Sequence, residues 1–225
     1  MKSVAKLMIL TAVTIIFFSA CNSSLNGSDP YYKISSLFKQ YCLFQAQSQW
    51  TYRNDSTNKT YNVSITNVSP YIGFHSPNNV AGPYSYDAID MIYDTANRLN
   101  LLKSSINAGD PSSGTGKMKD LYWLFFKNGN YLLAFAPGYP MGVAQRLGKN
   151  PGLYTNLQLL NSFSLNGKNY SDVYHSQVKK TEGTPDTVTY EFYFALHYGL
   201  IKWTRRVNGK ETSFSLAQSH LIQQQ

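Results

Sequence analysis

The chain has 225 residues, of which 15% are aromatic and 14% are charged, and its formal net charge is +8. Its 18 tyrosines, together with many threonines, serines and asparagines, favour strands over helices. The length suits one large β domain or two small ones. A basic balance can signal nucleic-acid binding, but the export signal described next argues against such a partner.

The first twenty residues have the pattern of an export signal. Lys2 and Lys6 form a short basic region, and the apolar run 7–18 has the length of a signal-peptide core. A membrane span would need roughly 20 apolar residues. The sequence Phe18-Ser19-Ala20-Cys21 that follows resembles the lipobox of bacterial lipoproteins, which implies removal of residues 1–20 and a lipid on Cys21. The alternative is an ordinary signal peptide with an incidental cysteine.

Residues 21–30 are expected to form a flexible lipidated tether, because they are polar, contain glycine and serine, and show no periodicity. Asn22 is not the aspartate that marks inner-membrane retention in many Gram-negative lipoproteins, so an outer-membrane location is favoured. The tether also lacks the early acidic cluster that is linked to surface export in the Bacteroidota. The periplasmic face of the outer membrane is therefore slightly favoured over the cell surface.

Residues 31–225 are then expected to form a single β-rich domain. Removing residues 1–20 takes away Lys2 and Lys6 and lowers the net charge from +8 to +6. This basic surface is either plainly solvated or attracts an anionic glycan or lipid headgroup. Cys42 is left without a disulfide partner and is expected to be a small buried hydrophobic residue.

A helix is predicted over about 34–47, where apolar residues follow the spacing of an amphipathic helix. Ser35 and Ser36 could cap it, and its apolar stripe should lie on the sheet. These stripe residues are Ile34, Leu37, Phe38, Tyr41 and Cys42.

Strands are predicted at 50–53 and 61–68, joined through a polar turn at 54–60. Residues 69–83 contain three prolines and two glycines and are predicted to be loop. The segment 88–102 fits a strand, because Ile89, Met91 and Tyr93 alternate with polar residues, but it also fits a helix. Residues 108–119 are predicted to be a mobile loop. Val188, Tyr190, Phe192 and Phe194 fall on every second position, which predicts a half-buried strand there.

Three Asn-Gly dipeptides predict β-hairpins in an antiparallel meander. Around Asn128-Gly129 the expected pairs are Phe126–Tyr131, Phe125–Leu132 and Tyr122–Phe135. Around Asn166-Gly167 they are Phe163–Tyr170 and Leu160–Val173. Around Asn208-Gly209 they are Val207–Lys210, Arg206–Glu211, Trp203–Phe214 and Ile201–Leu216, which would place Trp203 in the core. The Gly- and Pro-rich stretch 137–156 is predicted to be a long excursion.

Two motifs in the last third of the chain resemble those of a family of poorly characterised Bacteroidota outer-membrane lipoproteins. They are Gly167-Lys168-x-Tyr170-x-Asp172-Val173 and Tyr193-Phe194-Ala195-x-x-x-Gly199-Leu200-Ile201-Lys202. The resemblance covers roughly 160–221 and less of the region around Trp50. It implies a mainly β fold, a curved antiparallel sheet in a half-barrel or small open barrel around one N-terminal amphipathic helix. It implies no catalytic residue.

No catalytic, cofactor or metal motif stands out. The four histidines, at positions 75, 175, 197 and 220, have no HExxH spacing. Asp87, Asp90 and Asp94 lack the spacing of an EF-hand, and no G-x-S-x-G elbow surrounds a serine. We therefore expect a non-catalytic protein without a cofactor or a metal.

The hairpin 121–136 is apolar on both faces, so one face should meet the core. The other face is covered either by the helix, through Leu37 and Tyr41, or by the excursion 137–156, or it lines a ligand cleft. The candidate ligand face comprises Tyr122, Trp123, Phe125, Tyr131, Phe135 and Tyr139. The resulting hypothesis is an envelope lipoprotein that binds a glycan, lipid or peptide. The alternative is an accessory lipoprotein that binds another envelope protein.

Overall fold

The computed structural model describes residues 30–75, 83–109, 119–146, 152–181 and 187–223. Contacts divide the chain into Met1–Tyr31 and Tyr32–Gln225, and the second unit carries the fold. The predicted export signal and nearly all of the tether lie outside the described residues. Most of the predicted loop 108–119 also lies outside them, although Ala108 itself is buried.

The fold is mainly β, with one short helix, α2 (Ser36–Cys42). The strands, in chain order, are β1 (Tyr31–Tyr32), β2 (Gln49–Asn54), β3 (Thr60–His75), β4 (Tyr84–Tyr93), β5 (Leu101–Asn107), β6 (Leu121–Phe126), β7 (Tyr131–Phe135), β8 (Gly152–Leu165), β9 (Lys168–Thr181), β10 (Thr187–Ala195), β11 (Gly199–Val207) and β12 (Lys210–His220). Eleven of them form one path, in the order β7-β6-β5-β4-β3-β2-β12-β11-β10-β9-β8. Neighbours along this path pair antiparallel.

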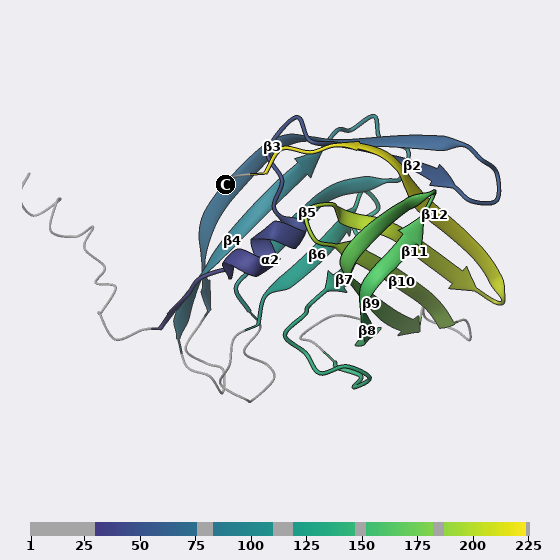
Figure 1. Cartoon of the computed structure of the whole chain (residues 1–225). Helices are drawn as coiled ribbons and strands as arrows, with labels where there is room; N and C mark the ends of the chain where they lie inside the picture. The colour runs from purple at the N-terminus through teal and green to yellow at the C-terminus, as the bar shows by residue number, and fades with distance from the viewer. Residues whose placement is uncertain (1–29, 76–82, 110–118, 147–151, 182–186, 224–225) are drawn as a thin grey trace, which may run out of the picture. The chain divides into compact units, whose positions relative to one another are not determined.

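The sheet curls into a nearly closed, barrel-like shape, and α2 lies within its curve (Figure 1). Phe135 on β7, at one end of the strand order, stacks on Phe194 of β10, with ring centroids 4.8 Å apart. It also packs on Phe38 of α2, at 5.4 Å. The predicted curved antiparallel sheet with an N-terminal helix is confirmed.

Side chains, rather than a backbone ladder, join β7 to the other end of the sheet. Ser176 Oγ on β9 donates to the Ala134 carbonyl at 2.7 Å. The Ala136 amide donates to Tyr154 Oη at 2.8 Å, and Asn156 Nδ2 donates to the Ala136 carbonyl at 2.9 Å. These bonds satisfy backbone groups that an open sheet edge would leave unpaired.

The helix is shorter than the predicted 34–47. Ser35 caps it, as expected, by accepting from the Phe38 amide at 3.3 Å. It ends at Cys42 because Leu43 is extended, which lets Leu43 and Phe44 enter the core. Leu37 is 58% exposed, so its predicted role as a cover is wrong, whereas Tyr41 does face the core.

Two of the three hairpins have the predicted register. Asn166-Gly167 and Asn208-Gly209 have positive φ at both positions, as a two-residue type I′ turn requires. The pairs Phe163–Tyr170, Leu160–Val173, Val207–Lys210, Arg206–Glu211 and Trp203–Phe214 are all observed.

The third hairpin differs, because its turn contains three residues rather than two. Gly129 alone has positive φ, and the Phe126 amide donates to the Asn130 carbonyl. Phe125 therefore pairs with Tyr131, and Leu124 with Leu132, one position away from the prediction. A bulge after Tyr122 removes the offset, so the predicted Tyr122–Phe135 pair is observed.

The predicted loop 69–83 is wrong in its first half, because β3 continues to His75. Pro70 is tolerated there because β2 pairs with β3 only over 60–64. Beyond that point the described chain places only β4 beside β3, so the missing N–H can face the open edge. The ambiguous segment 88–102 begins as strand, since β4 extends to Tyr93. At the end of the predicted excursion 137–156, residues 152–156 already belong to β8.

Candidate functional site

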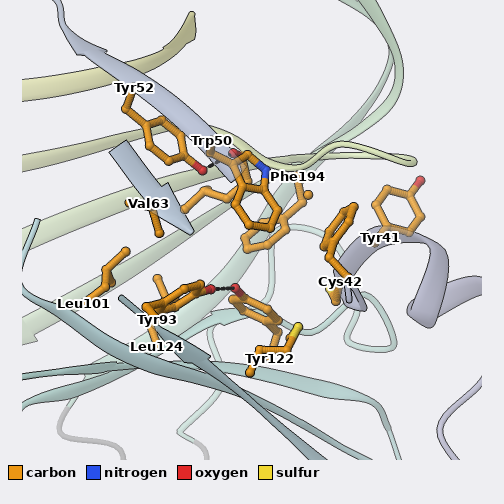
Figure 2. A pocket seen from close by; sticks show the side chains of 14 residues that line it. Tyr41, Cys42, Trp50, Tyr52, Val63, Tyr93, Leu101, Tyr122, Leu124 and Phe194 are labelled. Atoms are coloured by element: carbon orange, nitrogen blue, oxygen red, sulfur yellow. Dashed lines mark hydrogen bonds between the residues drawn. The ribbon is translucent and has the colours of Figure 1, made fainter. Parts of the chain in front are cut away.

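A small cavity lies in the interior between α2 and the sheet (Figure 2). Its volume is about 20 Å³, which is room for about one water molecule. The polar groups around it are paired within the protein. Tyr93 and Tyr122 share a hydrogen bond at 3.1 Å, and Tyr52 Oη donates to the Leu200 carbonyl at 2.7 Å. This space belongs to the core.

The Cys42 thiol at this cavity is not a reactive group. Burial raises the pKa of Cys42 well above its ordinary value, and the Asp120 carboxylate adds to the rise. Because the thiolate is the nucleophilic form of cysteine, the thiol stays protonated and inert. The expectation that Cys42 is a small buried hydrophobic residue agrees with this environment.

A larger cleft of about 340 Å³ opens between the two halves of the curved sheet. One wall comes from the β4–β5 turn and the β6–β7 hairpin. The opposite wall comes from β9, β10 and β11. The lining residues are Leu99, Asn100, Phe126, Asn128, Asn130 and Leu132 on the first wall, and Lys180, Tyr190, Trp203 and Arg205 on the second.

Aromatic side chains supported by the core line this cleft. Trp203 is half-buried and lies flat on Phe214, with ring centroids 4.5 Å apart and an interplanar angle of 11°. Tyr190 lies parallel to Phe192, at 6.3 Å and 4°. Trp203 was expected in the core. Instead it packs on the core residue Phe214 and also lines the cleft.

Two cationic side chains stand on the same wall. Arg205 pairs with Tyr190 across the β10–β11 ladder, and Arg205 Nε donates to Tyr190 Oη at 3.4 Å. Lys180 pairs with Val188 on the other side of β10. Lys180 and Arg205 are the charged side chains among the described residues that line the cleft, and both are cationic.

The opposite rim presents three asparagine side chains on turns that are tied together. The Lys127 amide donates to the Asn100 carbonyl at 2.8 Å, and Lys127 Nζ donates to the Asn97 carbonyl at 3.0 Å. Asn128 Oδ1 accepts from the Asn130 amide. These bonds hold the backbone of the rim across from Trp203 and Arg205, and the rim carries the side-chain amides of Asn100, Asn128 and Asn130.

The structure does not bring the six residues of the predicted ligand face together. Tyr122, Phe135 and Tyr139 are buried. Trp123, Phe125 and Tyr131 remain half-exposed and lie together, with Tyr131 stacked on Phe125 at 5.9 Å and 6.0 Å from Trp123. By strand alternation these three lie opposite Leu124 and Leu132, which face the interior.

Sequence reasoning missed the residues of the cleft, because they come from strands that only the curl of the sheet brings together. The alternation Tyr190, Phe192, Phe194 did place Tyr190 on the core face, which was the one available signal. The hairpin register did pair the neighbouring Arg206 with Glu211, as observed at 2.5 Å, but it gave Arg205 no role.

Three of the acidic and histidine residues that could suggest chemistry, Asp90, Asp94 and His175, have structural partners. Asp90 binds Lys103 at 2.5 Å, and Asp94 accepts from the Ala96 amide. His175 contacts Glu191 at 3.1 Å. Within the described ranges, no three His, Cys, Asp or Glu side chains gather as a metal site would require.

No described helix is long and apolar enough to span a bilayer. No protein-family model and no curated protein matches the sequence. Among solved structures, the chain is similar to a candidate lipoprotein from Parabacteroides distasonis, with 9% identity and a TM-score of 0.40, over 80% of this chain and 99% of that one. It is also similar to a candidate outer membrane lipoprotein-sorting protein domain from Vibrio parahaemolyticus, with 10% identity and a TM-score of 0.20, over 78% of this chain and 83% of that one.

Proposed function

We propose that the protein is a lipid-anchored envelope protein that binds an acidic glycan in the cleft between the β6–β7 hairpin and β9–β11, without catalysis. The observation that carries this proposal is the composition of the cleft. It combines the aromatic faces of Trp203 and Tyr190, the cations Lys180 and Arg205, and three asparagine amides on the opposite rim.

Each of these groups matches one part of an acidic sugar. Aromatic faces supply flat apolar area with a polar edge, against which the C–H face of a sugar ring can lie. The amides suit hydroxyl groups, and arginine binds carboxylates with two parallel hydrogen bonds. A cleft with a few placed polar groups on apolar walls is the usual form of a small-ligand site.

The geometry supports a glycan better than a lipid tail or a peptide. An acyl chain would need a deep apolar cavity, and the interior cavity has a volume of only about 20 Å³. An extended peptide commonly pairs with a strand edge, whereas the walls of this cleft are turns and strand faces. Of the ligands that the sequence left open, a glycan therefore fits best.

The proposed anchor is Cys21, on the basis of the lipobox-like sequence, with the periplasmic face of the outer membrane as the location. Several acyl chains would make release from the bilayer negligible, whereas a single chain binds only marginally. Intact-mass measurement of membrane-extracted protein tests this directly. A mature chain that begins elsewhere, or a Cys21→Ala protein that stays on the membrane, would contradict the anchor.

Calorimetry with defined oligosaccharides tests the cleft. We expect a tetragalacturonate to bind and maltotetraose, which is uncharged, to bind at least tenfold more weakly. Arg205→Gln should weaken binding of the acidic sugar about tenfold or more. Arg206→Gln is the matched control, because it removes the same charge one residue along β11 and outside the cleft, and it should leave binding unchanged. Equal effects of the two variants would refute the site.

A second candidate is an accessory lipoprotein that binds another envelope protein. The half-exposed cluster of Trp123, Phe125 and Tyr131 favours it, because aromatic residues are enriched at protein interfaces. Crosslinking in the native envelope, compared between the wild type and Phe125→Ser, tests this candidate. A partner that is lost in Phe125→Ser but retained in Arg205→Gln would identify this cluster, rather than the cleft, as the functional surface.

A further inference from the structure

The far end of β3 carries apolar side chains that are open to solvent. Tyr71, Ile72 and Phe74 are 48%, 68% and 60% exposed. The arm formed by β3 and β4 extends here beyond the part of β3 that pairs with β2. Large apolar side chains that are grouped at one exposed place commonly mark a contact with a protein or a membrane.

Ile72 and Phe74 project from the same face of the arm, because they are two residues apart in a strand. The opposite face at Gly73 is occupied by Tyr86. A Cβ on Gly73 would lie 2.3 Å from Tyr86 Cζ, so the ring packs directly on the glycine backbone. The tyrosine therefore supports the arm on one face, while Ile72 and Phe74 extend from the other.

The chain enters the folded unit at this same end. Tyr32 is the first residue of that unit, and its ring contacts Tyr84 edge-on at 5.7 Å. Tyr84 in turn stacks on His75 at 4.7 Å, next to Phe74. The described residue that lies closest in the chain to Cys21 within this unit is thus near the exposed apolar pair.

The length of the intervening chain limits which part of the domain can meet a membrane. The eleven residues from 21 to 31 span at most about 40 Å even when fully extended. The sixteen residues of β3 alone extend over about 50 Å. An anchor at Cys21 therefore favours contact between the bilayer and the end of the domain that contains Tyr32 and Phe74.

Charge at this end is compatible with a lipid surface. Lys33 is exposed beside Tyr32 and can approach headgroup phosphates. The segment of β3 from Thr66 to His75 contains no acidic residue. Asp87, which pairs with Ile72 across the ladder, accepts a hydrogen bond from the Ile34 amide at 3.2 Å.

We infer that Ile72 and Phe74 insert into the surface of a lipid bilayer, as a second membrane contact beside the lipid on Cys21. This inference rests on the anchor proposed above. The insertion would hold the domain with its β3–β4 arm toward the membrane. The arm, and not the lipid alone, would then set the orientation of the cleft.

An environment-sensitive nitrobenzoxadiazole label tests the insertion. The label is placed on Phe74→Cys or on Leu159→Cys, a matched control on β8 that is 44% exposed. Cys42 is buried, so it should not react. The full lipidated chain is reconstituted in vesicles of phosphatidylethanolamine and phosphatidylglycerol. We expect a blue shift and at least fivefold slower quenching by dithionite at position 74, and neither effect at 159.

The outcomes separate failure of the insertion from failure of the anchor. Protein that stays on the vesicles with equally fast quenching at 74 and 159 overturns the insertion and leaves the anchor intact. A chain without lipid on Cys21 refutes the anchor, and the unlipidated chain is then sedimented with the same vesicles. In that case we expect the double variant Ile72→Ser/Phe74→Ser to lose binding to the vesicles and the control Leu102→Ser/Leu159→Ser to keep it. This pattern supports the insertion, and any other pattern overturns it.

Discussion

Trp203 connects stability and binding in one side chain. It stacks on Phe214 and also lines the cleft, so its removal should affect both. Truncating a fully buried tryptophan costs about 3–5 kcal/mol. Because Trp203 is only half-buried, we expect Trp203→Ala to lower the free energy of unfolding by about 2 kcal/mol in urea titrations.

Trp203→Phe is the matched control, because it keeps an aromatic face on Phe214. It should recover at least half of the lost stability. A loss above about 4 kcal/mol in Trp203→Ala would show a core residue with no free face, and would weaken its assignment to the cleft.

His175 should make stability depend on pH. Burial is the main cause that lowers the pKa of His175 below 6.5, and Lys202 acts in the same direction, while Glu191 opposes it. The neutral ring fits its neighbours, since Gln158 can donate to Nδ1 and Nε2–H can donate to Glu191.

In the range just below pH 6.5, the unfolded chain binds a proton at this site that the folded chain does not. The free energy of unfolding should therefore rise with pH through this range. The stability that the neutral ring contributes at higher pH is lost as the pH falls through the lowered pKa of His175. Urea titrations at several pH values should show a flatter dependence in His175→Gln. An unchanged slope in that variant would refute the assignment to His175.

At the scale of the element, the start of α2 depends on one serine. Ser35 Oγ accepts from the Phe38 amide and donates to Asp120. Loss of an N-cap costs about 1 kcal/mol, and Asp120 would also lose a partner. Ser35→Ala should therefore lower the free energy of unfolding by about 1–2 kcal/mol in urea titrations.

Ser36→Ala is the natural comparison, because it removes an exposed hydroxyl from the next residue. Its effect should be within about 0.5 kcal/mol of zero. Similar losses in the two variants would mean that the cap does not control the stability of the helix.

For the whole molecule, closure of the curved sheet depends on Asn156. Its side chain is fully buried and donates to the carbonyls of Ala136 and Tyr139, both at 2.9 Å. Asn156→Ala would remove a donor from each of these buried carbonyls, although the Ala136 carbonyl would still accept from the Tyr139 amide at 3.3 Å. A buried polar group that loses its partner costs about 1–3 kcal/mol. We expect a loss of about 3 kcal/mol in urea titrations, with faster hydrogen exchange at Ala136.

Asn67→Ala is the control, because Asn67 is an exposed asparagine on β3. It should change neither the free energy of unfolding nor the hydrogen exchange at Ala136. If Asn156→Ala destabilised the protein without faster exchange at Ala136, the seam between β7 and β8 would not be the point of weakness. The fold would then be closed mainly by the packing of Phe135 on Phe194.

The sequence alone determined features that depend on neighbouring residues. Asn166-Gly167 and Asn208-Gly209 accept positive φ at both turn positions, so a two-residue turn and its register follow from local geometry. The N-cap at Ser35 is equally local. Strand alternation in β10 also placed Val188, Phe192 and Phe194 in the core.

Only the tertiary structure decided features that depend on distant partners. The turn at Gly129 takes three residues, and α2 ends where Leu43 and Phe44 turn into the core. Strand β3 passes through Pro70 because, in the part of the chain that the structure describes, only β4 lies beside that stretch of β3. The cleft joins Arg205 to Asn100 although 105 positions separate them. The curl of the sheet brings these two residues to the same cleft. The curl itself depends on packing between strands that are remote in the sequence, and no local pattern encodes that packing.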